Sequence, residues 1–175
     1  NVAETCATLE FLSGEKLPLL TGNEATALGL IKGGVQAYIS YPMTPTSPIL
    51  HYMARMADEF ALKVIHPENE IAVMLMALGM AYCGQRVAVG TSGGGFCLMT
   101  EGLSLSGMAE LPVVVVLGQR PGPSTGLPTY SSQTELFFAM SAGQGEYPRF
   151  VAAPGDLEEA AYLGQLALGI SCKHQ

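Results

Sequence analysis

The sequence predicts an α/β fold in which helices cover both faces of a parallel sheet, making three layers. Short apolar runs alternate with longer segments of helical period along the 175 residues. The run Val113–Val116 is apolar on both faces, which is typical of a strand in the middle of a parallel sheet. The chain length suits one domain.

Five apolar runs are expected to be strands: Gln36–Tyr41, Lys63–His66, Arg86–Gly90, Leu111–Gly118 and Phe150–Ala153. Helices are expected from Thr21 to Gly34, Ser47 to Phe60, Asn69 to Tyr82, directly after Ser92–Gly95, and Asp156 to Leu168. The third helix carries no charge over Ile71–Ala81 and is expected to be buried all round. Residues 1–20 are expected to form a linker or entry segment, and residues 21–175 one domain from a longer subunit.

Charged residues are scarce, at 13% of the chain against 49% hydrophobic residues. Part of the surface is therefore expected to be covered by something other than solvent. A net charge of -7 without Lys or Arg clusters argues against a nucleic-acid partner. No apolar run is long enough for a membrane span, and no signal peptide is recognisable, so a cytoplasmic protein is expected. The four scattered cysteines predict no metal site.

The segment Tyr41–Pro48 follows a predicted strand and holds three prolines and three Ser or Thr hydroxyls. Its prolines could simply fix a turn, with Thr46 or Ser47 capping the next helix, and for this segment alone that interpretation is favoured. Loops after parallel strands also form ligand sites. A stiff loop of hydroxyls is suited to orienting a small polar ligand.

Glu68 and Glu70 precede the uncharged third helix. Capping of the helix dipole alone could explain either acid. A carboxyl group at the start of a buried helix is also a candidate for proton transfer.

Two further segments follow predicted strands. Thr91–Phe96 contains three glycines, which can form a tight turn or let a flat ligand approach the backbone. It matches neither a P-loop nor the dinucleotide fingerprint. Gln119–Thr129 carries a single arginine, Arg120, which is either a surface residue or a bidentate partner for a carboxylate.

Together these segments resemble the pyrimidine-binding domain of the alpha subunit of 2-oxoacid:ferredoxin (acceptor) oxidoreductases, and the pattern is closest to the 2-oxoglutarate type. The resemblance runs from about Gly22 to Leu168. Its five segments occur in the family's order: Gly22–Ala25, Tyr41–Pro45, Glu68–Ala72, Thr91–Phe96 and Arg120–Thr129.

The resemblance implies thiamine diphosphate bound between two domains. It makes Glu70, nine residues before Gly79, the carboxyl group that hydrogen-bonds the aminopyrimidine ring and helps to activate the cofactor. It implies that Thr44 contacts the substrate and that Arg120 receives the 2-oxoacid carboxylate. Other implied cofactor contacts are Pro42, Ser92, Gly93, Gly94 and Phe96; Gly94 stands where the family commonly has proline.

The family's Gly-Asp-Gly diphosphate motif and its cluster cysteines are missing from this sequence. The resemblance therefore implies a beta subunit that supplies diphosphate binding, magnesium and an iron–sulfur cluster. A second alpha subunit, ferredoxin and coenzyme A are further implied partners. The implied reaction is oxidative decarboxylation of a 2-oxoacid, with 2-oxoglutarate favoured, to its acyl-CoA. The alternative is a non-catalytic α/β scaffold; a stand-alone nucleotide-binding domain is disfavoured by the missing fingerprints.

Overall fold

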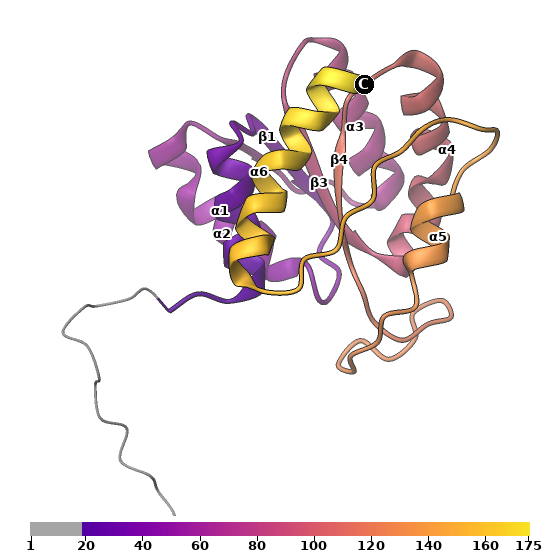
Figure 1. Ribbon diagram of the computed structural model, residues 1–175, viewed down its shortest axis with the longest axis horizontal. Coiled ribbons are helices and arrows are strands. Elements are labelled where there is room, and N and C mark those ends of the chain that lie inside the picture. Colours follow the sequence, from indigo (N-terminus) through magenta and orange to yellow (C-terminus); the bar gives the residue numbers. More distant parts are fainter. Residues whose placement is uncertain (1–18) are drawn as a thin grey trace, which may run out of the picture.

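The computed structural model describes residues 19–175 and contains a four-stranded parallel sheet between two layers of helices (Figure 1). Residues 1–18 of the expected linker lie outside the described part. The strands are β1 (Ala37–Ser40), β2 (Lys63–Ile65), β3 (Val87–Ser92) and β4 (Val114–Gly118). They pair in the order β2-β1-β3-β4. The predicted three-layer α/β class is confirmed.

The helices divide between the two faces of this sheet (Figure 1). On one face lie α1 (Gly22–Lys32), α2 (Ser47–Phe60) and α6 (Leu157–His174). On the other lie α3 (Glu70–Tyr82), α4 (Gly93–Ala109) and the short α5 (Leu136–Ser141). The sequence did not predict α5, which is shorter than two helical turns.

Side-chain caps begin α1 and α3. Thr21 and Glu24 form a capping box, in which the Glu24 carboxylate accepts the Thr21 backbone N–H at 2.9 Å. This hydrogen bond lowers the pKa of Glu24 below its ordinary value. The Asn69 side chain accepts the Ala72 backbone N–H at 2.9 Å. That cap makes Glu70 the first residue of α3.

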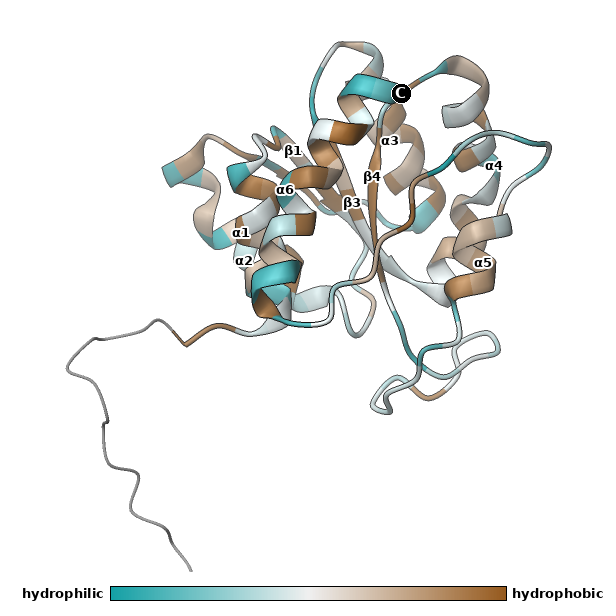
Figure 2. Cartoon of the chain, viewed as in Figure 1, coloured by the Kyte–Doolittle hydropathy of each residue, from teal (hydrophilic) through white to brown (hydrophobic). Residues whose placement is uncertain are grey.

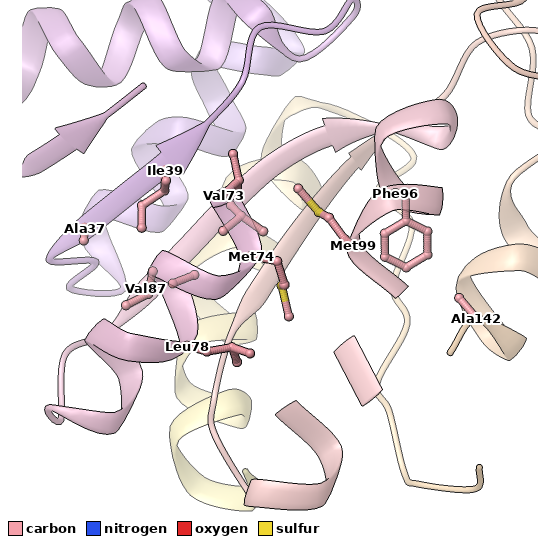
Figure 3. Packing of buried hydrophobic residues seen from close by; sticks show 11 residues of the cluster. Ala37, Ile39, Val73, Met74, Leu78, Val87, Phe96, Met99 and Ala142 are labelled. Carbon is pink, nitrogen blue, oxygen red and sulfur yellow. The ribbon is translucent and has the colours of Figure 1, made fainter. Parts of the chain in front are cut away.

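Alternation along the strands builds a separate core on each face of the sheet. Ile39 and Val87 point towards α3 and α4, where they pack with Met74 and Met99 (Figure 3). The intervening side chains face the other helices; Tyr38, for example, packs among residues of α1 and α2. The sheet is thus held from both sides, and loops at its carboxyl edge have a rigid base.

Two expectations about the edge of the sheet are wrong. Phe150–Ala153 is an exposed segment without strand pairing, and β4 is an edge strand rather than a central one. A groove of about 1280 Å³ runs beside β4 and is lined by β4, α6 and residues 150–152. Figure 2 shows β4 coloured as hydrophobic along its length. Phe150–Ala153 lines this groove without pairing with any strand of the described sheet.

The third helix is also not buried all round, contrary to expectation. Ile71, Leu75, Met76 and Tyr82 on α3 are exposed, and so is Leu98 on the neighbouring α4. These side chains lie on the outer surface of the helical layer, which no described segment covers. Exposed apolar surface of this kind is typical of a contact with another protein.

Replacing Tyr38 with phenylalanine should leave the stability of the subunit at pH 7 unchanged or raise it by up to about 1 kcal/mol, because the buried hydroxyl has no hydrogen-bond partner. Burial raises the pKa of Tyr38 above its ordinary value of 10.0. The free energy of unfolding is therefore fully retained below pH 10. It falls as the pH rises further, because Tyr38 ionises more readily in the unfolded chain than in the folded one. Thermal unfolding at pH 7 and pH 11 should therefore show a smaller alkaline loss for Tyr38→Phe than for wild type.

The matched control for this prediction is Tyr82→Phe, because the Tyr82 side chain is 81% exposed. This variant should keep the wild-type alkaline loss. An equal loss in Tyr38→Phe and wild type would contradict the prediction.

Candidate functional site

Four of the predicted site segments meet at one edge of the sheet. Thr44 follows β1, Glu70 follows β2, Ser92 ends β3 and Arg120 follows β4. All four strands are parallel, so their carboxyl ends share an edge, where ligands of α/β proteins commonly bind. The structure thus brings together loops that lie far apart in the sequence.

Arg120 is a buried cation at this edge, only 7% exposed. Its Nη1 donates to the Thr44 backbone carbonyl at 2.9 Å, which ties the β4 loop to the β1 loop. Its Nε has no hydrogen-bond partner. Among residues 19–175 the one ion pair joins Arg55 to Glu24, so no described carboxylate neutralises Arg120. A buried guanidinium without a counter-ion is costly and suited to binding an anion.

The loop that carries Thr44 is fixed from both sides while the residue itself stays exposed. Asn23 Nδ2 donates to the Pro45 carbonyl at 3.0 Å, linking α1 to the loop. The Thr46 hydroxyl donates to the Met43 carbonyl at 2.9 Å. Pro42 is half-buried at the start of this loop. These contacts present Thr44 on a stiff turn, as the prolines predicted.

Glu70 is 4% exposed, and its Oε1 has no hydrogen-bond partner. The carboxyl group rests against the first turn of α4, close to Gly95 and Thr91. A Cβ atom added at Gly95 would lie 2.5 Å from Oε1 of Glu70. Only glycine leaves the carboxyl group room at this position. Glu68, the alternative acid, is exposed.

The helix was expected to begin after Ser92–Gly95, but the three glycines are already the first turn of α4. Neighbouring atoms leave little room for a side chain at any of the three positions. A Cβ at Gly93 would lie 2.8 Å from the Glu135 carboxylate, and one at Gly94 would lie 3.1 Å from the Ser124 carbonyl. The helix can therefore start inside a crowded edge because its first residues have no side chains.

Ser92 and Phe96 flank these glycines and have different surroundings. The Ser92 hydroxyl is fully buried and has no hydrogen-bond partner. The Phe96 ring packs edge-on against Phe138 of α5, with 5.1 Å between the ring centroids. Phe96 thus contributes to the core beneath the site.

Sequence reasoning missed three residues here: Thr91, Gly95 and Glu135. A Cβ atom added at Gly95 would crowd both the Thr91 hydroxyl and the Glu70 carboxyl group, so the three residues lie close together. The position of Thr91 and Gly95 in the glycine segment was the available signal in the sequence. Glu135 is 7% exposed, with Oε2 unpartnered. Nothing in its sequence neighbourhood marks it as buried, because α5 was not recognised.

Buried polar atoms without a partner concentrate at this edge, on Glu70, Ser92, Arg120 and Glu135; the others in the described chain are on Tyr38 and Gln85. Such atoms are rare in folded proteins and call for an explanation. A carboxyl group and a hydroxyl are suited to binding ring nitrogens, and a guanidinium is suited to binding a carboxylate, so this edge can hold both kinds of group. In residues 19–175 no three His, Cys, Asp or Glu side chains gather as a metal site.

Comparisons with known proteins identify the family to which this fold belongs. The family model described as pyruvate flavodoxin/ferredoxin oxidoreductase, thiamine diphosphate-binding, matches residues 28–175. The 2-oxoacid:ferredoxin oxidoreductase subunit alpha of Saccharolobus solfataricus is 41% identical over 178 residues, covering 95% of this chain and 28% of the relative. The 2-oxoglutarate synthase subunit KorA of Archaeoglobus fulgidus is 38% identical over 148 residues, covering 85% of this chain and 43% of the relative.

A solved structure shows the same fold over most of the chain. The 2-oxoglutarate:ferredoxin oxidoreductase from Magnetococcus marinus, with 2-oxoglutarate, coenzyme A and succinyl-CoA bound, superposes with a TM-score of 0.84 at 37% identity. The match covers 87% of this chain and 27% of that one, so the chain spans about a quarter of the solved relative. With a family model that covers residues 28–175, the chain belongs to the thiamine diphosphate-binding pyruvate flavodoxin/ferredoxin oxidoreductase family.

Proposed function

We propose that this chain is the part of an alpha subunit of a 2-oxoacid:ferredoxin oxidoreductase that binds the aminopyrimidine half of thiamine diphosphate and the carboxylate of the substrate. The observation that carries the proposal is Arg120, a buried guanidinium without a described counter-ion, at the same edge as the unpartnered Glu70 carboxyl group. The reaction converts a 2-oxoacid and coenzyme A into an acyl-CoA, carbon dioxide and a proton, and ferredoxin accepts the electrons. We favour 2-oxoglutarate as the substrate because the relatives include enzymes named for it.

The Glu70 carboxyl group is the proposed partner of the cofactor ring. When bound, thiamine diphosphate supplies the nucleophilic carbon and the electron sink for decarboxylation. The unpartnered Oε1 of Glu70 can hold a proton and share it with a ring nitrogen. The other proposed cofactor contacts are Pro42, Ser92, Gly93, Gly94 and Phe96, of which Ser92 offers a buried, unpartnered hydroxyl.

Arg120 and Thr44 are the proposed substrate contacts. Arg120 can pair with a carboxylate through Nε and the guanidinium N–H groups that remain after Nη1 binds the Thr44 carbonyl. The exposed Thr44 hydroxyl stands on the fixed loop beside it. A non-catalytic scaffold would gain nothing from burying Arg120 without a counter-ion, which favours the catalytic proposal.

The remainder of the enzyme is proposed to lie on partner chains. The exposed apolar side chains Ile71, Leu75 and Leu98 lie on α3 and α4, the helices that carry the site. Their exposure favours docking of a beta subunit on the outer surface of these two helices. We assign magnesium, diphosphate binding and the iron–sulfur cluster to that subunit, and we expect a second alpha subunit, ferredoxin and coenzyme A as further partners.

We expect the enzyme to work in the cytoplasm. The described cysteines Cys83, Cys97 and Cys172 are free thiols, as is usual in a reducing compartment. Along residues 19–175, every helix falls short of the length and apolarity that a bilayer span requires.

The direct test is to assemble the full-length alpha subunit with its beta subunit and measure ferredoxin reduction. The proposal predicts reduction that requires thiamine diphosphate, coenzyme A and a 2-oxoacid together, with 2-oxoglutarate turned over faster than pyruvate. The scaffold alternative would be favoured, and the proposal overturned, if a correctly assembled complex failed to reduce ferredoxin with every 2-oxoacid tested.

Substituting Gly95 with alanine should lower turnover by about 10²-fold, because the new methyl group displaces the Glu70 carboxyl group from its place against α4. Some loss of stability, about 1–3 kcal/mol, should accompany this overpacking. Turnover of the assembled enzyme and its thermal midpoint are the measurements. Gly79→Ala is the matched control, since a Cβ there meets nothing within 4 Å. Equal turnover in the two variants would contradict the prediction.

A further inference from the structure

Glu135 is a buried carboxyl group that has no role in the proposed chemistry. It is 7% exposed and precedes α5, yet its side chain makes no capping hydrogen bond to that helix. Oε1 accepts the Thr134 hydroxyl at 3.2 Å, and Oε2 has no partner. A buried carboxyl group that does not cap its own helix needs another explanation.

The backbone of Glu135 closes the loop that carries Arg120. This loop leaves β4 at Gln119, lies at the bottom of Figure 1 and returns at Glu135, where α5 begins. The Glu135 backbone N–H donates to the Gln119 side-chain oxygen at 3.3 Å. Gln119 is the residue directly before Arg120, so the two ends of the loop are joined beside the arginine.

The side chain of Glu135 turns instead towards the start of α4. A Cβ on Gly93 would lie 2.8 Å from Oε1 of Glu135 and 3.0 Å from its Cγ. The same loop touches the helix again at Ser124, whose carbonyl would lie 3.1 Å from a Cβ on Gly94. The amino end of a helix favours a carboxylate through its free N–H groups and its dipole. The loop therefore lies against α4 at two points, the Glu135 carboxyl group and the Ser124 carbonyl.

We propose that Glu135 is a positioning residue that holds the Arg120 loop on the first turn of α4 and so sets the arginine relative to the bound 2-oxoacid. Its backbone fixes the loop beside Gln119, and its carboxylate fixes the loop against Gly93. Arg120 then meets the substrate carboxylate in a predetermined orientation. This inference rests on the proposed function, because it takes Arg120 as the carboxylate-binding residue.

The test uses the assembled holoenzyme of full-length subunits with Glu135→Gln and Glu135→Ala. Both variants should raise the KM for the 2-oxoacid, by about tenfold in Glu135→Ala and by less in Glu135→Gln, which keeps the size of the side chain. The KM for coenzyme A should not change, and kcat should stay within about threefold of wild type. Glu146→Gln, at an exposed glutamate, is the matched control and should keep wild-type constants.

Arg120→Met, measured alongside, separates failure of this inference from failure of the proposed function. If Arg120→Met raises the KM for the 2-oxoacid but neither Glu135 variant does, Glu135 is not a positioning residue and the proposed function stands. A lower thermal midpoint with an unchanged KM in the Glu135 variants would likewise leave Glu135 with a structural role alone. If Arg120→Met itself leaves the KM unchanged, both the substrate role of Arg120 and this inference are overturned.

Discussion

Replacing Glu70 with glutamine should lower turnover of the assembled enzyme by about 10²–10⁴-fold, the usual contribution of a proton-transfer group. The buried Oε1 of Glu70 has no hydrogen-bond partner within the described chain, so it is free to interact with the cofactor ring. Glutamine at this position cannot exchange a proton with that ring. Glutamine keeps the size of the side chain, so the subunits should assemble normally. Ferredoxin reduction at saturating 2-oxoacid and coenzyme A, together with size-exclusion chromatography of the complex, measures both expectations.

Glu68→Gln is the matched control, because Glu68 lies two residues earlier and is exposed. It should turn over at the wild-type rate. Retained turnover in Glu70→Gln, or an equal loss in both variants, would remove Glu70 from the proposed catalytic role.

Arg120→Met should raise the KM for the 2-oxoacid by roughly 30- to 150-fold, since a hydrogen-bonded charge pair contributes about 2–3 kcal/mol. The arginine is buried without a described counter-ion, so its pairing energy is available to the substrate carboxylate. Methionine fills similar volume without charge. The KM for coenzyme A should remain at the wild-type value, and initial rates over a range of both substrates measure the two constants.

Two comparison variants sharpen the Arg120 prediction. Arg120→Lys keeps the charge but loses the planar fork, so it should recover only part of the affinity. Arg55→Met removes an exposed arginine whose side chain is 64% accessible and should leave both constants unchanged. An unchanged 2-oxoacid KM in Arg120→Met would argue that the substrate carboxylate binds elsewhere.

The fold class and the meeting of Thr44, Glu70, Ser92 and Arg120 at one edge could be predicted because they follow from local patterns. Alternating apolar runs and helical periods identify parallel strands, and parallel strands place the residues that follow them on one side of the sheet. No knowledge of packing is needed for either step. The roles of these residues remain proposals.

The environment of the site could not be predicted, because it depends on contacts between distant segments. The approach of Glu135 to Gly93 joins residues more than forty positions apart, and only the folded structure shows it. Strand order posed the same difficulty. The valine run near residue 114 is apolar enough for a central strand, but its place at the edge depends on which neighbour pairs with it.

The free edge of β4 determines how the chain can be studied. Val114–Gly118 carries no charged or proline residue, and its outer backbone N–H and C=O groups pair with no described strand. Native proteins usually protect such an edge with charge, proline or a covering element, because it is a template for strand addition between molecules. Expressed alone, this stretch would favour aggregation, so catalysis should be assayed with assembled full-length subunits.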